Sequence, residues 1–180
     1  MMSTSSRAFV DDLALRHLDA AYNLGRWLLG SEQDAADAVH DAFVRATRSA
    51  HTYAGGNARA WWLAIVRNCC LAALKTRRRE TPSVAVEAIV DAGVDTAAND
   101  VESSAEVEER SRAIERQLRA LPVEFREALI LREVEDLSYR EIADVLDVPI
   151  GTVMSRLSRG RALLQKALAP RPPEGDMHGL

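Results

Sequence analysis

The sequence lacks most of the residue patterns that mark secreted, metal-binding and membrane proteins. Its two cysteines, Cys69 and Cys70, are neighbours, and adjacent cysteines do not readily close a disulfide or supply a zinc-binding spacing. No apolar run reaches the roughly 20 residues of a membrane span, and the first residues do not have the pattern of a secretory signal. We therefore expect a soluble protein of a reducing cytoplasm, without membrane insertion, in which both cysteines are small buried helix residues.

Residue sets that support catalysis or cofactor binding are missing as well. The histidines have no ligand spacing with the cysteines, and no glycine-rich phosphate-binding motif occurs. An enzyme would need a nucleophile, an acid/base pair or a metal cluster. We expect no catalytic residues, no metal, no cofactor and no small-molecule substrate.

Three long segments each lack charges of one sign. The net charge of −4 does not reveal this uneven distribution. Residues 42–79 and 150–169 contain no Asp or Glu, whereas residues 80–109 contain no Lys or Arg. Two basic segments separated by an acidic one are suited to contacting a polyanion at two places.

Helical periodicity dominates the chain, and no stretch alternates as a strand does. Residues 80–103 are small, acidic and aperiodic, which is typical of a flexible linker. We predict an all-α protein of two small helical domains, residues 1–79 and 104–169, joined by this acidic linker and followed by a disordered tail over 170–180.

Capping residues predict where several helices begin. Ser31 precedes a helix over 34–48, and Asn57 precedes a helix that runs to about Lys75. An earlier helix or helix pair should break near Gly30.

The second domain ends in the pattern of a helix-turn-helix. A capping box at Ser138–Glu141 begins a short helix, Asp147-Val148-Pro149 forms a turn, and a basic helix follows from about Gly151. Its predicted inward stripe is Val153, Leu157, Gly160, Leu164 and Leu168. An ordinary amphipathic helix is the alternative. We favour DNA binding, because arginines near a helix start suit the major groove and the cap, the turn and the missing acids occur together.

Two segments resemble a known family. "LPVEFREALILREVEDLSYREIADVLDVPIGTVMSRLSRGRALL" resembles region 4 of bacterial RNA polymerase sigma factors, above all the small extracytoplasmic-function (ECF) group. "SEQDAADAVHDAFVRATRSAHTYAGGNARAWWLAIVRNCCLAALKTRRR" is similar to region 2 of the same group. The resemblance implies an alternative sigma factor that binds core RNA polymerase, recognises the −35 and −10 promoter elements, assists DNA melting and is controlled by an anti-sigma factor.

The resemblance also implies roles for individual residues. Those carried over for binding core polymerase are Asp34, Asp37, Asp41, Phe43 and Arg45. Those for the −10 element are Tyr53, Asn57, Arg59, Trp61, Trp62, Arg67 and Asn68. Those for the −35 element are Thr152, Ser155, Arg156, Arg159 and Arg161. Adjacent helix residues lie about 100° apart, so one tryptophan is expected in the core and the other at DNA, without a choice between them. In the family the linker threads through the polymerase, and a plain tether is the alternative.

Two other classes of function compete with this interpretation. A free-standing helix-turn-helix regulator would bind an operator without polymerase, but it leaves the first domain unexplained. An antagonist that mimics sigma contacts is disfavoured by the basic segments in both domains.

Overall fold

A computed structural model describes residues 4–80 and 104–169, and these residues form helices without strands. Residues 81–103 of the predicted linker, the predicted tail and residues 1–3 lie outside the described residues. The first domain comprises α1 (Thr4–Arg16), α2 (Leu18–Leu29), α3 (Glu32–Ser49), the short 3₁₀ helix η1 (Ala50–Thr52) and α4 (Ala58–Glu80). The second comprises α5 (Ser104–Ala120), α6 (Val123–Leu129), the π-helical turn η2 (Ile130–Val134), α7 (Tyr139–Leu146) and α8 (Ile150–Leu168). The all-α prediction is confirmed.

The helix boundaries follow the predicted caps. The Ser31 hydroxyl accepts a hydrogen bond from the Asp34 amide at 3.3 Å, and the Asn57 side chain accepts one from the Ala60 amide at 3.0 Å. Ser138 and Glu141 form both bonds of a capping box. Gly30 ends α2 with φ of 75°, a left-handed conformation that favours glycine. The α4 helix extends to Glu80, five residues beyond the predicted end.

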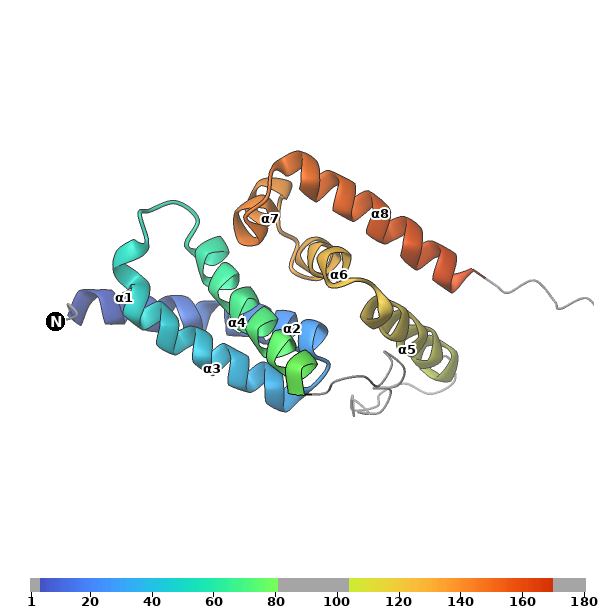
Figure 1. Ribbon diagram of the computed structural model, residues 1–180, viewed down its shortest axis with the longest axis horizontal. Coiled ribbons are helices and arrows are strands. Elements are labelled where there is room, and N and C mark those ends of the chain that lie inside the picture. The colour runs from blue at the N-terminus through green and yellow to red at the C-terminus, as the bar shows by residue number, and fades with distance from the viewer. Residues whose placement is uncertain (1–3, 81–103, 170–180) are drawn as a thin grey trace, which may run out of the picture.

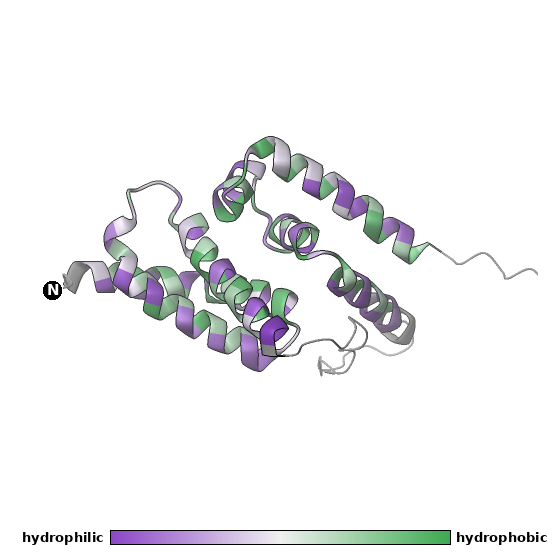
Figure 2. Cartoon of the chain, viewed as in Figure 1, coloured by the Kyte–Doolittle hydropathy of each residue, from purple (hydrophilic) through white to green (hydrophobic). Residues whose placement is uncertain are grey.

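Each domain has an apolar interior. In the first domain, α2, α3 and α4 pack together around Leu24, Leu28, Trp62 and Leu63, all at most 2% exposed. Figure 2 shows apolar helix faces turned toward neighbouring helices, whereas α5 is largely hydrophilic. Cys69 and Cys70 are free thiols in this core, as predicted. Burial raises the pKa of Cys70 to about 12, so this thiol is protonated at neutral pH.

The α8 helix packs on α6 through part of its predicted stripe. Val153, Leu157 and Gly160 are buried, and a Cβ at position 160 would lie 3.0 Å from Leu129 Cδ1. A glycine therefore permits this close approach. The stripe ends earlier than predicted, because Leu168 is 39% exposed.

The two domains lie side by side in contact (Figure 1). The α7 helix and the α6–η2 segment pack against α4 and α2. This contact was not predicted from the sequence, and it involves many of the residues assigned to DNA.

Candidate nucleic-acid interface

The helix-turn-helix presents a set of polar side chains at the start of α8. Ser155 and Arg159 are exposed, and Thr152 is half-buried beside them. The Ser155 hydroxyl donates to the Thr152 carbonyl at 3.0 Å. The N-terminal half of α8 thus offers short polar groups and an arginine without an ion-pair partner among the described residues, which suits base or phosphate contact.

The other two predicted arginines of α8 are engaged within the protein. Arg161 binds Glu133 through two hydrogen bonds of 2.6 and 3.1 Å, and this partner above all raises the pKa of Arg161. Arg156 donates to Glu127 at 3.2 Å. Both guanidiniums must leave or share these carboxylates in order to bind DNA.

Two aromatic side chains assigned to the −10 element lie together at the start of α4. Tyr53 and Trp61 have ring centroids 5.5 Å apart. Phe9 of α1, which the sequence did not single out, stacks on Tyr53 at 5.1 Å. Tyr53 and Trp61 line a hollow together with Asn57 and with Asp144 from the second domain. A hollow with aromatic walls can hold an unstacked base.

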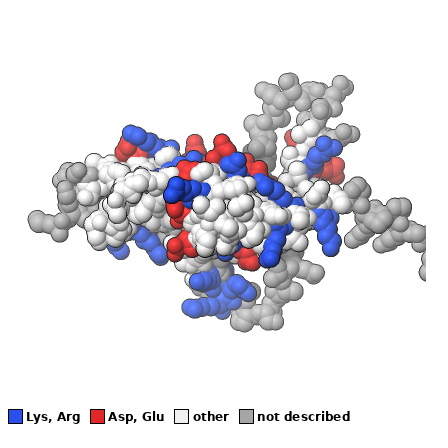
Figure 3. Space-filling model, turned by 90° about the horizontal axis from the view of Figure 1, so that it is seen from above, with Lys and Arg blue, Asp and Glu red and all other residues white. Residues whose placement is uncertain are grey.

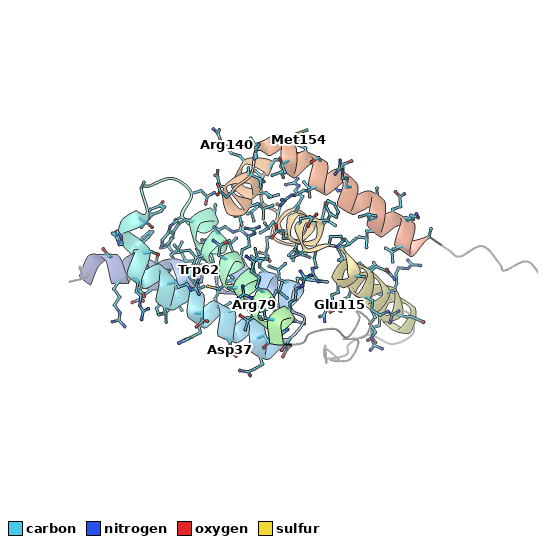
Figure 4. The ribbon with its side chains drawn as sticks, viewed as in Figure 1. Asp37, Trp62, Arg79, Glu115, Arg140 and Met154 are labelled. Atoms are coloured by element: carbon cyan, nitrogen blue, oxygen red, sulfur yellow. The ribbon has the colours of Figure 1, made fainter. Side chains whose placement is uncertain are left out.

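Trp62 is a correction to the predicted DNA-contacting set. Its side chain is fully buried in the core of the first domain (Figure 4), so it cannot reach a base in this structure. The choice that the sequence left open is settled in favour of Trp62 as the core residue, with Trp61 half-buried at the hollow.

The remaining polar residues assigned to the −10 element lie along α4 beside the second domain. Arg67 makes two hydrogen bonds to Glu127, and Arg59 donates to the Glu135 carbonyl at 2.9 Å. Asn57 donates to Glu141 at 2.7 Å. Asn68 is exposed. Figure 3 shows acidic and basic side chains intermixed on the face viewed, in place of an uninterrupted basic surface.

The residues assigned to polymerase binding lie on α3. Asp37, Asp41 and Arg45 are exposed at a spacing of four residues, which aligns them on one face. Asp34 forms an ion pair with Arg77 at the end of α4. Phe43 is half-buried against the core, so only its outer part is available to a partner.

Other kinds of site find no support in the described ranges. No group of three or more His, Cys, Asp or Glu side chains there could hold a metal ion. Within residues 4–80 and 104–169, no helix combines the length and apolarity needed to cross a bilayer.

Comparisons with known proteins match each of the two helical domains to a sigma-70 region. Residues 13–80 match the family model of sigma-70 region 2, and residues 111–164 match that of sigma-70 region 4. The chain is 34% identical to the ECF RNA polymerase sigma factor SigE of Mycolicibacterium smegmatis, over 91% of this chain and 63% of that protein. It is 36% identical to the RNA polymerase sigma-H factor of Pseudomonas aeruginosa, over 91% of this chain and 88% of that protein.

A solved structure shares the fold across both domains. The sigma factor RpoE of Bartonella quintana, crystallised with the anti-sigma factor NepR, superposes with a TM-score of 0.69 at 26% identity. The superposition covers 88% of this chain and 95% of that one. With both regions matched in order, the chain belongs to the ECF group of the sigma-70 family, the factors that direct promoter-specific initiation by RNA polymerase.

Proposed function

We propose that this chain is an alternative sigma factor that recognises a −35 element through α8 and a −10 element through the start of α4. The observation that carries the proposal is the pairing of two sites in one chain. One is the exposed, acid-free N-terminal half of α8, which bears Ser155 and Arg159, and the other is a hollow walled by Tyr53 and Trp61. Promoter recognition requires a helix that binds duplex DNA, and promoter melting requires a pocket that binds an unstacked base.

The proposal divides the chain into residues 1–79 for polymerase binding and the −10 element, and residues 104–169 for the −35 element. The exposed face of α3 is the proposed polymerase contact, since a helix can dock by laying one accessible face against partner helices. Catalysis belongs to the polymerase, and this chain contributes no chemical step, cofactor or metal of its own.

An anti-sigma factor is the proposed regulator. The support is the solved relative, which was crystallised with its anti-sigma factor and superposes over both domains. We place the protein in the cytoplasm, where the chromosome and polymerase are, and an anti-sigma factor in the membrane would hold it at the membrane surface.

The −35 assignment is tested by a matched pair of substitutions in α8. Arg159→Ala removes an exposed arginine from near the middle of α8, and Lys166→Ala removes an exposed cation from its last turn. On one promoter, loss of a base contact costs about 1–3 kcal/mol and relaxes the preference at one base pair. Arg159→Ala should therefore lower transcription roughly tenfold or more, and it should alter the sequence preference in the −35 element but not in the −10 element. Lys166→Ala should produce neither effect. Equal effects of both substitutions would refute the assignment.

A free-standing regulator is distinguished by binding without polymerase. The purified protein should bind promoter fragments weakly and gain strong, specific binding with core polymerase. Tight specific binding by the protein alone, without transcription from core polymerase, would favour the regulator.

A further inference from the structure

A third aromatic ring supports the two that wall the hollow at the start of α4. Phe9 of α1 stacks on Tyr53, with ring centroids 5.1 Å apart and ring planes inclined by 23°. Its ring centroid also lies 6.4 Å from that of Trp61. Phe9 does not line the hollow itself, whose aromatic walls are Tyr53 and Trp61. A substitution of Phe9 therefore affects a base in the hollow only through these two rings.

The packing of α1 fixes the position of the Phe9 ring. Val10, Leu13 and Ala14 of the same helix are at most 8% exposed, and α1 packs against η1 and α4 (Figure 1). Phe9 is half-buried beside these core residues. Because its helix is anchored by buried neighbours, Phe9 presents a fixed apolar surface to the loop that precedes α4.

That loop, residues 53–57, has little conformational restriction of its own. Gly55 and Gly56 have φ values of 92° and 95°, a region that glycine adopts without strain. A Cβ at either position would meet no atom within 4 Å, so backbone conformation and not space accounts for the two glycines. Consecutive glycines make a loop entropically costly to hold in one shape. Contacts at its two ends must supply the restriction.

Tyr53 restrains the first end of the loop, and Asn57 restrains the second by capping α4. The Tyr53 hydroxyl donates to the Gly56 carbonyl at 2.7 Å. This hydrogen bond is exposed, and water competes with such a bond, so its net contribution is small. The stack on Phe9 is apolar, and water does not compete for it. It holds the Tyr53 ring, and the loop with it, against α1.

We propose that Phe9 is a positioning residue for base capture: its ring holds the Tyr53 wall of the hollow in the place where an unstacked base of the −10 element is received. The inference rests on the proposed function of the hollow. A binding wall that is held in place beforehand loses less conformational freedom when the base binds. The proposal gives α1 a part in −10 recognition, although the resemblance assigned no residue of this helix to DNA.

Ordinary core packing is the alternative role of Phe9. A residue that only packs would contribute to the stability of the domain, and its loss would not change how binding responds to one particular base. Leu13 supplies the control, because it lies one turn further along α1, is 5% exposed and carries no ring. The comparison of Phe9→Ala with Leu13→Ala therefore concerns dependence on a base, and not the strength of binding alone.

An abasic scan measures this dependence. Core polymerase reconstituted with the full chain is titrated with single-stranded non-template DNA of the −10 element, taken from a promoter whose start site has been mapped, with one base at a time replaced by an abasic site. Wild type and Leu13→Ala should lose affinity roughly tenfold at the position of the captured base, which is the size of effect that stacking on aromatic side chains gives. In Phe9→Ala the same abasic site should cost less than about threefold, because the intact DNA has already lost this stacking. A full tenfold cost in folded Phe9→Ala would overturn the inference.

Substitutions of the ring test whether stacking is the cause, and they decide the matter if Phe9→Ala fails to fold. Phe9→Tyr keeps an aromatic ring and should keep the dependence on the base, whereas Phe9→Leu keeps apolar bulk without a ring and should reduce it. In the Tyr53→Ala background, Phe9→Ala should have little further effect, because Phe9 acts through Tyr53. Equal behaviour of Phe9→Tyr and Phe9→Leu, or fully additive effects of Phe9→Ala and Tyr53→Ala, would refute the positioning role.

The scan also separates this inference from the proposed function. If no abasic site weakens the binding of wild type more than the others do, the hollow captures no base, and the −10 assignment and this inference both fail. If wild type shows a captured base and Phe9→Ala responds as strongly at that position, the −10 assignment stands and the role of Phe9 is refuted.

Discussion

Arg67 and Glu127 form a two-bond ion pair between the domains, with Nε–Oε2 at 2.7 Å and Nη2–Oε1 at 2.9 Å. The parallel geometry matches the fork of the guanidinium to the carboxylate. The two side chains are only 15% and 2% exposed, so water screens the pair far less than it screens an exposed one. This pair connects the stability of the interface to the availability of Arg67 for DNA.

A double-mutant cycle of Arg67→Ala and Glu127→Ala measures the coupling energy of this ion pair. We expect a favourable coupling of about 1–3 kcal/mol in the free energy of unfolding, because the pair is buried and has two bonds. The exposed pair Glu108–Arg112 on α5 is the control, and its coupling should stay below about 0.5 kcal/mol. Urea unfolding followed by circular dichroism gives both coupling energies. Equal couplings would contradict a strong buried ion pair between Arg67 and Glu127.

The adjacent tryptophans should separate stability from promoter opening. Trp62→Ala empties a fully buried site and should lower the free energy of unfolding by about 3–5 kcal/mol. Trp61→Ala, at the rim of the hollow, should cost less stability and reduce DNA melting by the reconstituted polymerase. Fluorescence of 2-aminopurine placed in the −10 element measures melting. Normal melting with folded Trp61→Ala would contradict its assignment to DNA.

The two tryptophans show which structural features local sequence patterns can predict and which they cannot. The sequence predicted that one of Trp61 and Trp62 is buried, because neighbours on a helix face different directions. It also predicted the caps at Ser31, Asn57 and Ser138, since a cap depends on the next three residues. The choice of tryptophan depended on where α2 and α3 pack against α4, which periodicity in α4 does not reveal.

The interface between the domains was beyond prediction for the same reason. Glu127 and Arg67 are 60 residues apart in the chain, and no local pattern indicates that one faces the other. One signal was available: Glu127 precedes the apolar run Ala128–Leu131, where an acidic residue needs a partner. Arg156 was assigned to DNA through the resemblance to region 4, and no local pattern indicated its ion pair with Glu127.

Polymerase binding should depend on the exposed face of α3. Asp41→Lys reverses a charge in the Asp37–Asp41–Arg45 row and should weaken binding to core polymerase about tenfold, because like charges across an interface are unfavourable. Stability should change by less than about 0.5 kcal/mol, since the residue is exposed. Glu109→Lys on α5 is the control for charge reversal. Fluorescence anisotropy of labelled protein measures the affinity, and identical affinities for both variants would exclude α3 as the contact.

Glu141 should make the free energy of unfolding depend on pH. Chiefly through the Ser138 backbone N–H, which donates at 2.7 Å, its pKa lies below the ordinary 4.5. A carboxylate with a lowered folded pKa stabilises the protein above its unfolded pKa, and the contribution is lost as the pH falls through the folded pKa. Wild type should therefore exceed Glu141→Gln in stability at pH 7, by a margin that shrinks below about pH 4.5.

Urea midpoints of both proteins between pH 7 and pH 3 measure this margin. Glu109→Gln controls for the loss of one negative charge from an exposed position. A margin between wild type and Glu141→Gln that stays constant over the whole range would contradict the assigned hydrogen bonds.

The central claim is that this chain gives promoter specificity to core RNA polymerase, and run-off transcription tests it most directly. Sigma-free core polymerase is incubated with genomic fragments, with and without the protein, and the 5′ ends of the transcripts are mapped. The account predicts discrete start sites that require the protein and that share a two-part sequence at a fixed distance upstream. The same transcripts with and without the protein would contradict it.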